Sequence, residues 1–205
     1  MESYTTVLER GSFEYEDRKS VFIGEALPVK SEEEALLFIS AIKKKYSDAR
    51  HHVYAYVLRD NSILRFSDDR EPQGTAGMPV LDVIRKNGCT DVVIVVTRYF
   101  GGTLLGTGGL VRAYTAAAIG ALENATIVTY DTYAEYKITV SYSDYQKLQA
   151  KFTEISFRQS DVKFADNVYI RGSVLKKESQ DFEKKLTELL ANRASVEFLG
   201  FKFDF

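Results

Sequence analysis

A buried strand that ends in a cluster of glycines constrains the fold of this chain more than any other feature. Val92–Val96 is an unbroken apolar run, mostly β-branched, which is typical of a strand covered on both faces. Five glycines follow within Gly101–Gly109, and small apolar residues then recur at helical spacing through Leu110–Ala121. The pattern predicts a strand, a glycine-rich loop and a helix that packs closely on a sheet.

The glycine-rich loop has two interpretations. A helix that follows such a loop presents unpaired backbone N–H groups and the positive end of its dipole, about half an elementary charge, which favours an anion. The alternative is that the glycines only supply positive φ angles or allow helix and sheet to approach closely. The candidate anion or nucleic-acid contacts are Arg98, Tyr99, Gly101, Gly102, Gly106, Thr107, Gly108, Gly109 and Arg112.

The two arginines of this set each have a functional and a structural interpretation. Arg98 precedes two aromatic residues at the loop edge, and both guanidinium groups and rings stack on bases, so it is a candidate ligand-facing group. It could equally be a structural arginine that pairs with Asp68 or Asp69. Arg112 lies in the first turns of the helix, where its charge opposes the dipole, and this suggests an anionic partner.

The common nucleotide-binding fingerprints do not fit this loop. Gly101 and Gly106 have the outer spacing of a P-loop, but Thr107 stands where the lysine is required. In the dinucleotide pattern, counted from Gly106 and Gly108, the third glycine position falls on Val111. Both simple nucleotide readings are weak.

A second loop, Asp68–Pro79, reads DDREPQGTAGMP and leads into a helix that starts near Gln73 or Thr75. Its three acids could bind Mg²⁺ or act as acid and base, or they could pair with arginines or cap backbone amides. The candidate residues of this loop are Asp68, Asp69, Glu71, Gly74 and Thr75.

Two long motifs, RYFGGTLLGTGGLVRAY and DDREPQGTAGMP, together resemble the IMPACT family, in particular its bacterial, YigZ/YvyE-type members. The resemblance covers essentially the whole chain. It implies an N-terminal domain similar to domain IV of elongation factor G and a C-terminal domain similar to its domain V. It also implies a role in control of translation, with RNA, the ribosome or a translation-associated protein as partner. It establishes no catalytic residue and implies no cofactor, and the kinase pathway of the eukaryotic members is not carried over.

Composition limits the function classes. The chain has 205 residues, 45% of them hydrophobic and 27% charged, with a net charge of −2, so it lacks the bulk electrostatics of a protein that coats nucleic acid. Any RNA contact must use a local patch. We expect a cytoplasmic protein, because the chain shows no signal peptide and no membrane-spanning run. The single cysteine, Cys89, excludes an intramolecular disulfide and a multi-thiolate zinc site.

The fold class expected is α+β, with an N-terminal α/β-sandwich domain over residues 1–128 and a ferredoxin-like domain over residues 129–205. The second part reads as strand, helix, strand, strand, helix, strand, which is the ferredoxin-like order. Its third strand offers only Tyr169 for base stacking, where an RNA platform needs two or three rings. Phe201, Phe203 and Phe205 alternate on the last strand and are expected to face the helices.

Local patterns place further elements. Ser31 is expected to cap a helix over Glu32–Tyr46, and Ser143 and Ser179 to cap the two helices of the second domain. Asp60–Asn61 is expected to form a turn between two strands. The two histidines, at 51 and 52, are neighbours on a strand and should point to opposite faces, so they are not expected to share a metal.

Three functions are therefore weighed. The leading hypothesis is a non-enzymatic regulator that binds RNA, the ribosome or a translation factor through the two loops. The rival is a phosphotransferase or nucleotide hydrolase, in which Asp68 and Glu71 hold Mg²⁺ beside a bound phosphate. The third is an adaptor that binds protein only. Oligomeric state does not follow from the sequence.

Overall fold

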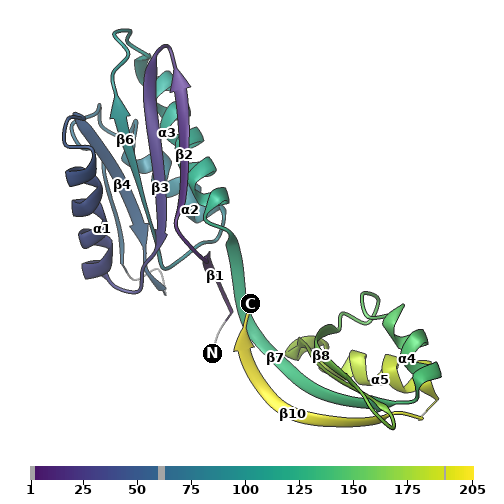
Figure 1. The fold of residues 1–205 in the computed structure, drawn as a ribbon. Coiled ribbons are helices and arrows are strands. Elements are labelled where there is room, and N and C mark those ends of the chain that lie inside the picture. Colours follow the sequence, from purple (N-terminus) through teal and green to yellow (C-terminus); the bar gives the residue numbers. More distant parts are fainter. Residues whose placement is uncertain (1–2, 60–62, 192) are drawn as a thin grey trace. The chain divides into compact units, whose positions relative to one another are not determined.

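The computed structural model describes residues 3–59, 63–191 and 193–205, which divide into two compact units (Figure 1). One unit comprises Tyr4–Thr129, and the other comprises Tyr130–Phe205 with Ser3. The turn expected at Asp60–Asn61 lies outside the described residues. Within the described residues, no helix is both long enough and apolar enough to cross a membrane.

The N-terminal unit is built on a five-stranded antiparallel sheet. Its strand order is β2-β3-β6-β4-β5. The bounds are β2 (Gly11–Asp17), β3 (Ser20–Pro28), β4 (His51–Val57), β5 (Leu64–Ser67) and β6 (Val92–Tyr99). A short strand, β1 (Tyr4–Val7), is separate from β2 and lies beside β7 (Ile127–Val140), with the Thr5 and Thr129 hydroxyls 2.9 Å apart.

Helices cover both faces of this sheet (Figure 1). On one face lies α1 (Glu32–Lys45), and on the other lie α2 (Gly77–Lys86) and α3 (Gly106–Asn124). The central strand β6 shows the consequence for the sequence. Val92, Ile94 and Val96 belong to the core beneath α2 and α3, whereas Val93 and Val95 belong to the core beneath α1. Both sets of side chains leave water, so the strand is apolar at every position, as predicted.

The C-terminal unit confirms the predicted ferredoxin-like arrangement. Its antiparallel strand order is β10-β7-β9-β8. The bounds are α4 (Tyr142–Gln149), β8 (Arg158–Phe164), β9 (Val168–Leu175), a 3₁₀ turn η2 (Lys176–Glu178), α5 (Ser179–Leu190) and β10 (Ser195–Asp204). Tyr136 and Ile138 of β7 pack in one core with Phe182 and Leu186 of α5, so both helices lie on one face of this sheet (Figure 1).

The last strand corrects one expectation. Phe201 is 57% exposed and Phe205 is 46% exposed, while Phe203 is half-buried, so these side chains do not fill the core beneath the helices. Among the described residues β10 pairs with β7 alone, and its side chains therefore lie at the margin of the sheet. Their alternation resembled a core strand because aromatic spacing does not distinguish an edge strand from a central one.

The helix caps are predicted correctly in one case of three. The Ser31 hydroxyl accepts the Glu34 N–H at 3.2 Å at the start of α1, as expected. At α4 the cap is Ser141, which accepts the Asp144 N–H, rather than Ser143. Ser179 is the first helical residue of α5, and its hydroxyl donates to the Lys176 carbonyl. Any serine within two residues of a helix start matches the sequence preference for an N-cap, so the sequence alone does not show which serine is the cap.

Candidate functional site

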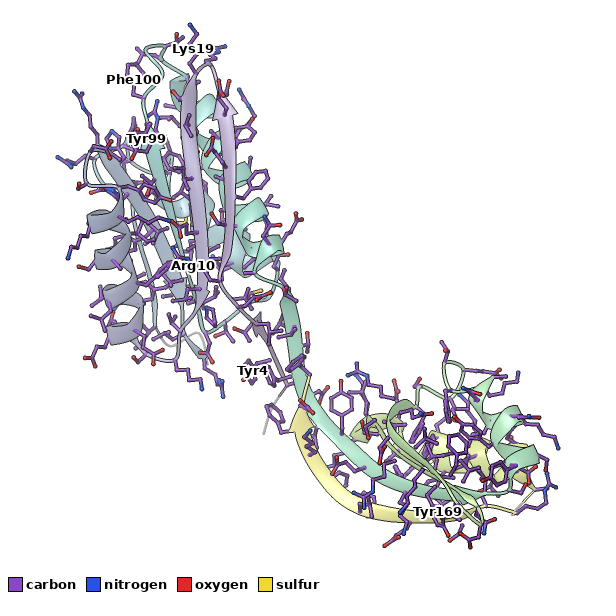
Figure 2. The ribbon with its side chains drawn as sticks, viewed as in Figure 1. Tyr4, Arg10, Lys19, Tyr99, Phe100 and Tyr169 are labelled. Atoms are coloured by element: carbon purple, nitrogen blue, oxygen red, sulfur yellow. The ribbon has the colours of Figure 1, made fainter. Side chains whose placement is uncertain are left out.

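One end of the N-terminal sheet gathers the segments that the sequence singled out. In the register of β6, Tyr99 lies opposite Val21 at the start of β3, and Arg98 lies opposite His51 at the start of β4. The β2–β3 turn, the glycine-rich loop and the segment before β4 therefore meet at this end. Lys19, Tyr99 and Phe100 are seen together there in Figure 2. We call this region the glycine-loop end.

Part of the glycine-rich loop has a purely structural explanation. The Gly101 N–H donates to the Ser20 hydroxyl at 3.0 Å, and a Cβ atom on Gly101 would lie 2.1 Å from the carbonyl carbon of Lys19. Gly102 has a φ of +86°, which favours glycine. These two residues support the interpretation in which glycines serve close packing and backbone conformation.

Gly108 has no such explanation. It lies exposed in the first turn of α3, and a Cβ atom there would meet only the Arg112 Nη1, at 3.6 Å. A glycine inside a helix costs about 0.5–1 kcal/mol relative to alanine. Leu105 occupies the N-cap position and gives no side-chain hydrogen bond to the helix. Thr107 and Gly108 are therefore exposed at a helix start that has no side-chain cap, with the Arg112 guanidinium beside Gly108.

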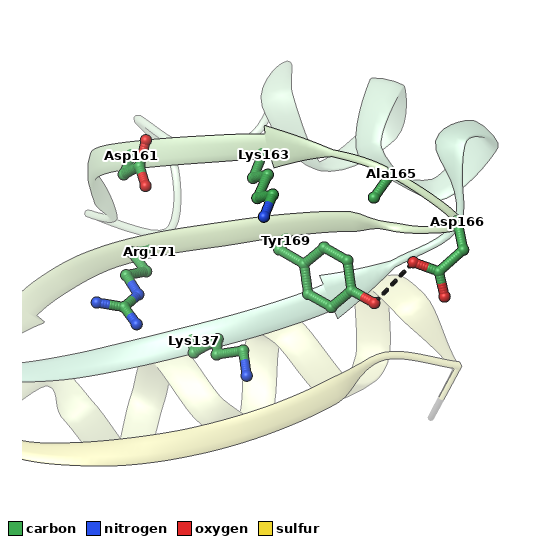
Figure 3. A pocket seen from close by; sticks show the side chains of 7 residues that line it. All are labelled: Lys137, Asp161, Lys163, Ala165, Asp166, Tyr169 and Arg171. Atoms are coloured by element: carbon green, nitrogen blue, oxygen red, sulfur yellow. Dashed lines mark hydrogen bonds between the residues drawn. The ribbon is translucent and has the colours of Figure 1, made fainter.

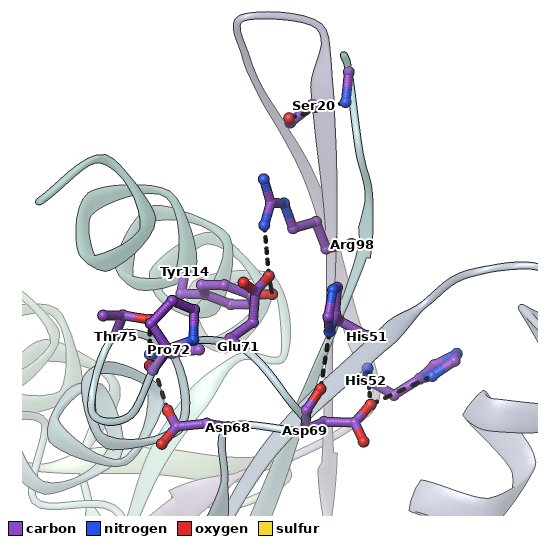
Figure 4. Close-up of polar contacts among 12 residues, drawn as sticks. Ser20, His51, His52, Asp68, Asp69, Glu71, Pro72, Thr75, Arg98 and Tyr114 are labelled. Atoms are coloured by element: carbon purple, nitrogen blue, oxygen red, sulfur yellow. Dashed lines mark hydrogen bonds and ion pairs between the residues drawn. The ribbon is translucent and has the colours of Figure 1, made fainter. Parts of the chain in front are cut away.

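Arg98 is a structural residue, which corrects its expected ligand-facing role. It is only 6% exposed, and its Nη1 lies 2.6 Å from Glu71 Oε1 (Figure 4). The sequence left open a pairing with Asp68 or Asp69, but the partner is Glu71. The reason is strand alternation: Arg98 falls on the same face of β6 as Val96, beneath α2 and α3 rather than toward solvent.

Glu71 joins β6 to α3. The same Oε1 atom accepts the hydroxyl of Tyr114, a fully buried residue of α3, at 2.7 Å. Burial, and then the charge of Glu71, raise the pKa of Tyr114, so its phenol stays a proton donor at neutral pH. The Arg98 Nε has no hydrogen-bond partner among the described residues. Tyr114 was not identified from the sequence, where a tyrosine at helical spacing has no distinguishing signal.

The carboxylate of Asp68 caps a helix. Its Oδ1 accepts the N–H groups of Ala76 and Gly77 at 3.1 and 2.8 Å, and its Oδ2 accepts the Gly74 N–H at 2.9 Å. The Thr75 hydroxyl donates to the Pro72 carbonyl at 2.6 Å, which tightens the same turn. Gly74 and Thr75 thus stabilise the turn that precedes α2 through hydrogen bonds within the loop.

Asp69 faces the two histidines (Figure 4). Its Oδ2 accepts the His52 N–H at 2.6 Å, and its carbonyl oxygen lies 2.8 Å from the His51 Nδ1. His52 Nε2 lies 3.0 Å from the Tyr46 carbonyl, so the two imidazoles contact different groups. Each of the three acids in this loop has separate donors. Among the residues that the structure describes, no group of three or more acid, histidine or cysteine side chains is arranged to hold a metal.

The sequence reasoning missed two cations at the glycine-loop end. Arg18 and Lys19 form the β2–β3 turn, both with positive φ (47° and 64°) and both exposed. The Arg18 Nη1 lies 3.4 Å from the Leu104 carbonyl of the glycine-rich loop. Two residues between two expected strands indicate a tight turn, and the sequence shows that both are basic. This was the signal that could have identified Arg18 and Lys19 as exposed cations. Arg112 is exposed on α3 as well.

Exposed apolar and aromatic groups accompany these cations. Phe100 is 52% exposed and Leu104 is 80% exposed. The Tyr99 hydroxyl donates to Asp48 at 2.8 Å, and this bond, followed by burial, raises the pKa of Tyr99. Flat rings beside guanidinium and ammonium groups are the arrangement that single-stranded nucleic acid binds.

Each of the two units matches a known protein family. The Impact N-terminal domain matches residues 18–122, and a domain of unknown function, DUF1949, matches residues 138–193. "IMPACT family member YvyE" of Bacillus subtilis is 36% identical over 197 residues, which is 96% of this chain and 91% of that protein. "IMPACT family member YigZ" of Escherichia coli is 32% identical over 188 residues, which is 90% of this chain and 91% of that protein. A crystal structure titled as that of a hypothetical protein is 30% identical, covers 98% of each chain and has a TM-score of 0.61.

Proposed function

The chain belongs to the IMPACT family, and we propose that it is a non-enzymatic regulator related to translation that binds RNA, free or in the ribosome, through the glycine-loop end. The observation that carries this proposal is the exposed start of α3 at Gly108, which has no side-chain cap, together with the exposed cations Arg18, Lys19 and Arg112. The proposed setting is the cytoplasm, where such a partner is found.

The local electrostatics favour an anionic partner although the whole chain is slightly acidic. The three acids of the second loop are occupied by backbone amides, by His52 and by Arg98. The cations of the β2–β3 turn and of α3 are exposed instead. A polyanion that approaches this end therefore meets exposed positive charge on the turn and on α3, which forms a local patch on a chain that is not basic overall.

The two helices that begin at this end differ in a way that supports the same conclusion. The first amides of α2 are occupied by the Asp68 carboxylate. The N-cap residue of α3 provides no equivalent group. A phosphate oxygen would complete the hydrogen bonds of α3 as the Asp68 carboxylate does for α2.

A nucleotide phosphotransferase or hydrolase is the less favoured function. This function requires Asp68 and Glu71 as Mg²⁺ ligands beside the glycine-rich loop. Asp68 accepts three backbone N–H groups and Glu71 is committed to Arg98 and Tyr114, so a metal would have to displace these donors. Mg²⁺-dependent, saturable binding of ATP or GTP with product formation would reverse this order. Binding that needs only protein, and survives nuclease, would favour the adaptor.

The test compares two triple variants of the full chain in binding to a labelled RNA and in cosedimentation with ribosomes. Arg18→Ala/Lys19→Ala/Arg112→Ala removes three charges at the glycine-loop end. Lys30→Ala/Arg85→Ala/Lys86→Ala removes three exposed charges from the opposite end of the same sheet. We expect the first variant to bind RNA at least about tenfold more weakly than the wild type. The slope of the logarithm of the binding constant against the logarithm of the salt concentration should fall in magnitude by about 2. Equal behaviour of the two variants would contradict the proposal.

Gly108→Ala provides a test that is independent of charge. Alanine is the better helix former, so we expect this variant to unfold at the same or a higher urea concentration, with a gain of up to about 1 kcal/mol. Its Cβ would stand where RNA is proposed to approach the backbone of α3, so RNA binding should weaken. A variant that is more stable and binds RNA as tightly as the wild type would show that the start of α3 is not a contact.

A further inference from the structure

A pocket lies on the open face of the C-terminal sheet, opposite the face that the helices cover (Figure 3). Its volume is about 460 Å³, within the range of sites for small ligands. It lies wholly within the C-terminal unit and is separate from the glycine-loop end. The pocket is lined by Lys137, Asp161, Lys163, Ala165, Asp166, Tyr169 and Arg171.

Strand alternation brings these side chains together. Ile170 of β9 and Ile138 of β7 are fully buried beneath the helices, so their neighbours Tyr169, Arg171 and Lys137 project to the other face. Lys163 lies directly opposite Tyr169 across the β8–β9 pair. The fold thus places a half-buried ring among three cations on an otherwise open sheet.

The ring of Tyr169 is held in place. Its hydroxyl donates to Asp166 Oδ1 at 2.9 Å in the β8–β9 turn. The Lys137 Nζ lies 6.0 Å from its ring centroid, and Lys137 also reaches Glu197 at 3.4 Å on β10. A ring fixed at its polar end loses little side-chain entropy when another flat group stacks on it.

Within the described residues, two of the three cations form no ion pair, although Arg171 faces Asp161 across the β8–β9 register. Lys163 and Arg171 are exposed, and neither makes an ion pair or a hydrogen bond within the described part of the chain. Asp166 is occupied by Tyr169, whereas Asp161 is exposed and lies opposite Arg171. The pocket therefore offers positive charge for phosphate and one free carboxylate for a hydrogen-bond donor.

We propose that this pocket binds a nucleotide of single-stranded RNA, with its base stacked on Tyr169 and the adjoining phosphates at Lys163 and Arg171. The free carboxylate of Asp161 is positioned to accept a hydrogen bond from an exocyclic amino group of a base. A flat aromatic face between separated cations suits a base and its backbone. An acidic peptide fits less well, because a run of carboxylates offers no flat group to stack on Tyr169 and no hydrogen-bond donor for Asp161.

The test uses the full chain in which Arg18→Ala/Lys19→Ala/Arg112→Ala has weakened the glycine-loop end, so that the two sites can fail separately. Binding of a labelled five-nucleotide RNA is measured by fluorescence anisotropy. Tyr169→Leu removes the ring, and Tyr169→Phe keeps the ring but removes the bond to Asp166. We expect Tyr169→Leu to weaken binding about tenfold and Tyr169→Phe to change it by less than about twofold.

The charges are tested with a matched pair of double variants. Lys163→Ala/Arg171→Ala should weaken binding and flatten its salt dependence. Lys177→Ala/Lys184→Ala removes two exposed charges from η2 and α5 and should leave binding unchanged. The proposal is overturned if the parent chain does not bind the RNA, or if Tyr169→Leu and Tyr169→Phe weaken RNA binding equally. It is also overturned if both double variants bind the RNA alike, or if a pentaglutamate peptide competes as well as unlabelled RNA.

Discussion

Among single residues, Arg98 shows most clearly why a motif does not reveal the direction of a side chain. The order arginine, tyrosine, phenylalanine at a loop edge is typical of a stacking site, yet the arginine is buried on Glu71. The partner was not predictable because three acids lie within four positions. Asp69 and Arg70 both have positive φ angles, and the composition of the loop does not encode this backbone path.

Replacing Glu71 should therefore destabilise the fold strongly. Glu71→Gln keeps the shape but leaves the buried Arg98 guanidinium without its counter-ion, and we expect the free energy of unfolding to fall by about 3–5 kcal/mol. Tyr114→Phe removes one hydrogen bond to the same carboxylate and should cost about 1–3 kcal/mol. Urea denaturation measures both. Glu33→Gln, on the exposed side of α1, is the control and should cost about 0.5 kcal/mol or less. A glutamine variant as stable as this control would refute the structural role of the pair.

Among the helices and strands, those with two buried faces or one strong periodicity were predictable. β6 and α3 follow from hydrophobic spacing, because burial on both sides of a strand requires apolar residues at every position. The exposed aromatic residues of β10 did not follow, because position within a sheet is a property of the whole topology. The cap positions at α4 and α5 failed for a smaller reason, a choice between neighbouring serines.

Gly101 offers a test of how the glycine-rich loop is joined to β3. A Cβ atom at this position would overlap the Lys19–Ser20 backbone, which is part of the β2–β3 turn and has no flexible side-chain end that could move away. We expect Gly101→Ala to lower the free energy of unfolding by about 1–3 kcal/mol. Thermal unfolding followed by circular dichroism measures the change. Gly108→Ala, whose Cβ would make only an ordinary contact with the Arg112 Nη1 at 3.6 Å, is the matched control, and an equal loss in both variants would contradict this prediction.

For the whole molecule, the ferredoxin-like order of the second unit was predictable from the succession of elements, because two helix-containing crossovers and one β-hairpin leave few topologies. The pocket at Tyr169 was not. The sequence shows one ring where a platform needs several, and only the register of β8 on β9 reveals that Lys163 and Arg171 flank it. The use of the glycine-rich loop by a partner likewise stays a prediction.

Two modest RNA sites on one chain should act together on a long RNA. Each proposed surface is small, but once one is bound the other meets the same strand at a raised effective concentration. We expect a 30-nucleotide RNA to bind at least about tenfold more tightly than a five-nucleotide RNA. Weakening either surface should remove most of that gain. Titration of both RNAs at one salt concentration measures the effect, and equal affinities would show that the surfaces do not share a strand.

The carboxylate of Glu71 also ties together the two loops that the sequence marked separately. It belongs to the loop that precedes α2, and one of its oxygen atoms accepts hydrogen bonds from Arg98 of β6 and from Tyr114 of α3. Any force that draws α3 away from the sheet must stretch one of these bonds. The loop before α2 is therefore linked to α3 through Glu71. A displacement of either one strains the hydrogen bonds that Glu71 makes to Arg98 and Tyr114.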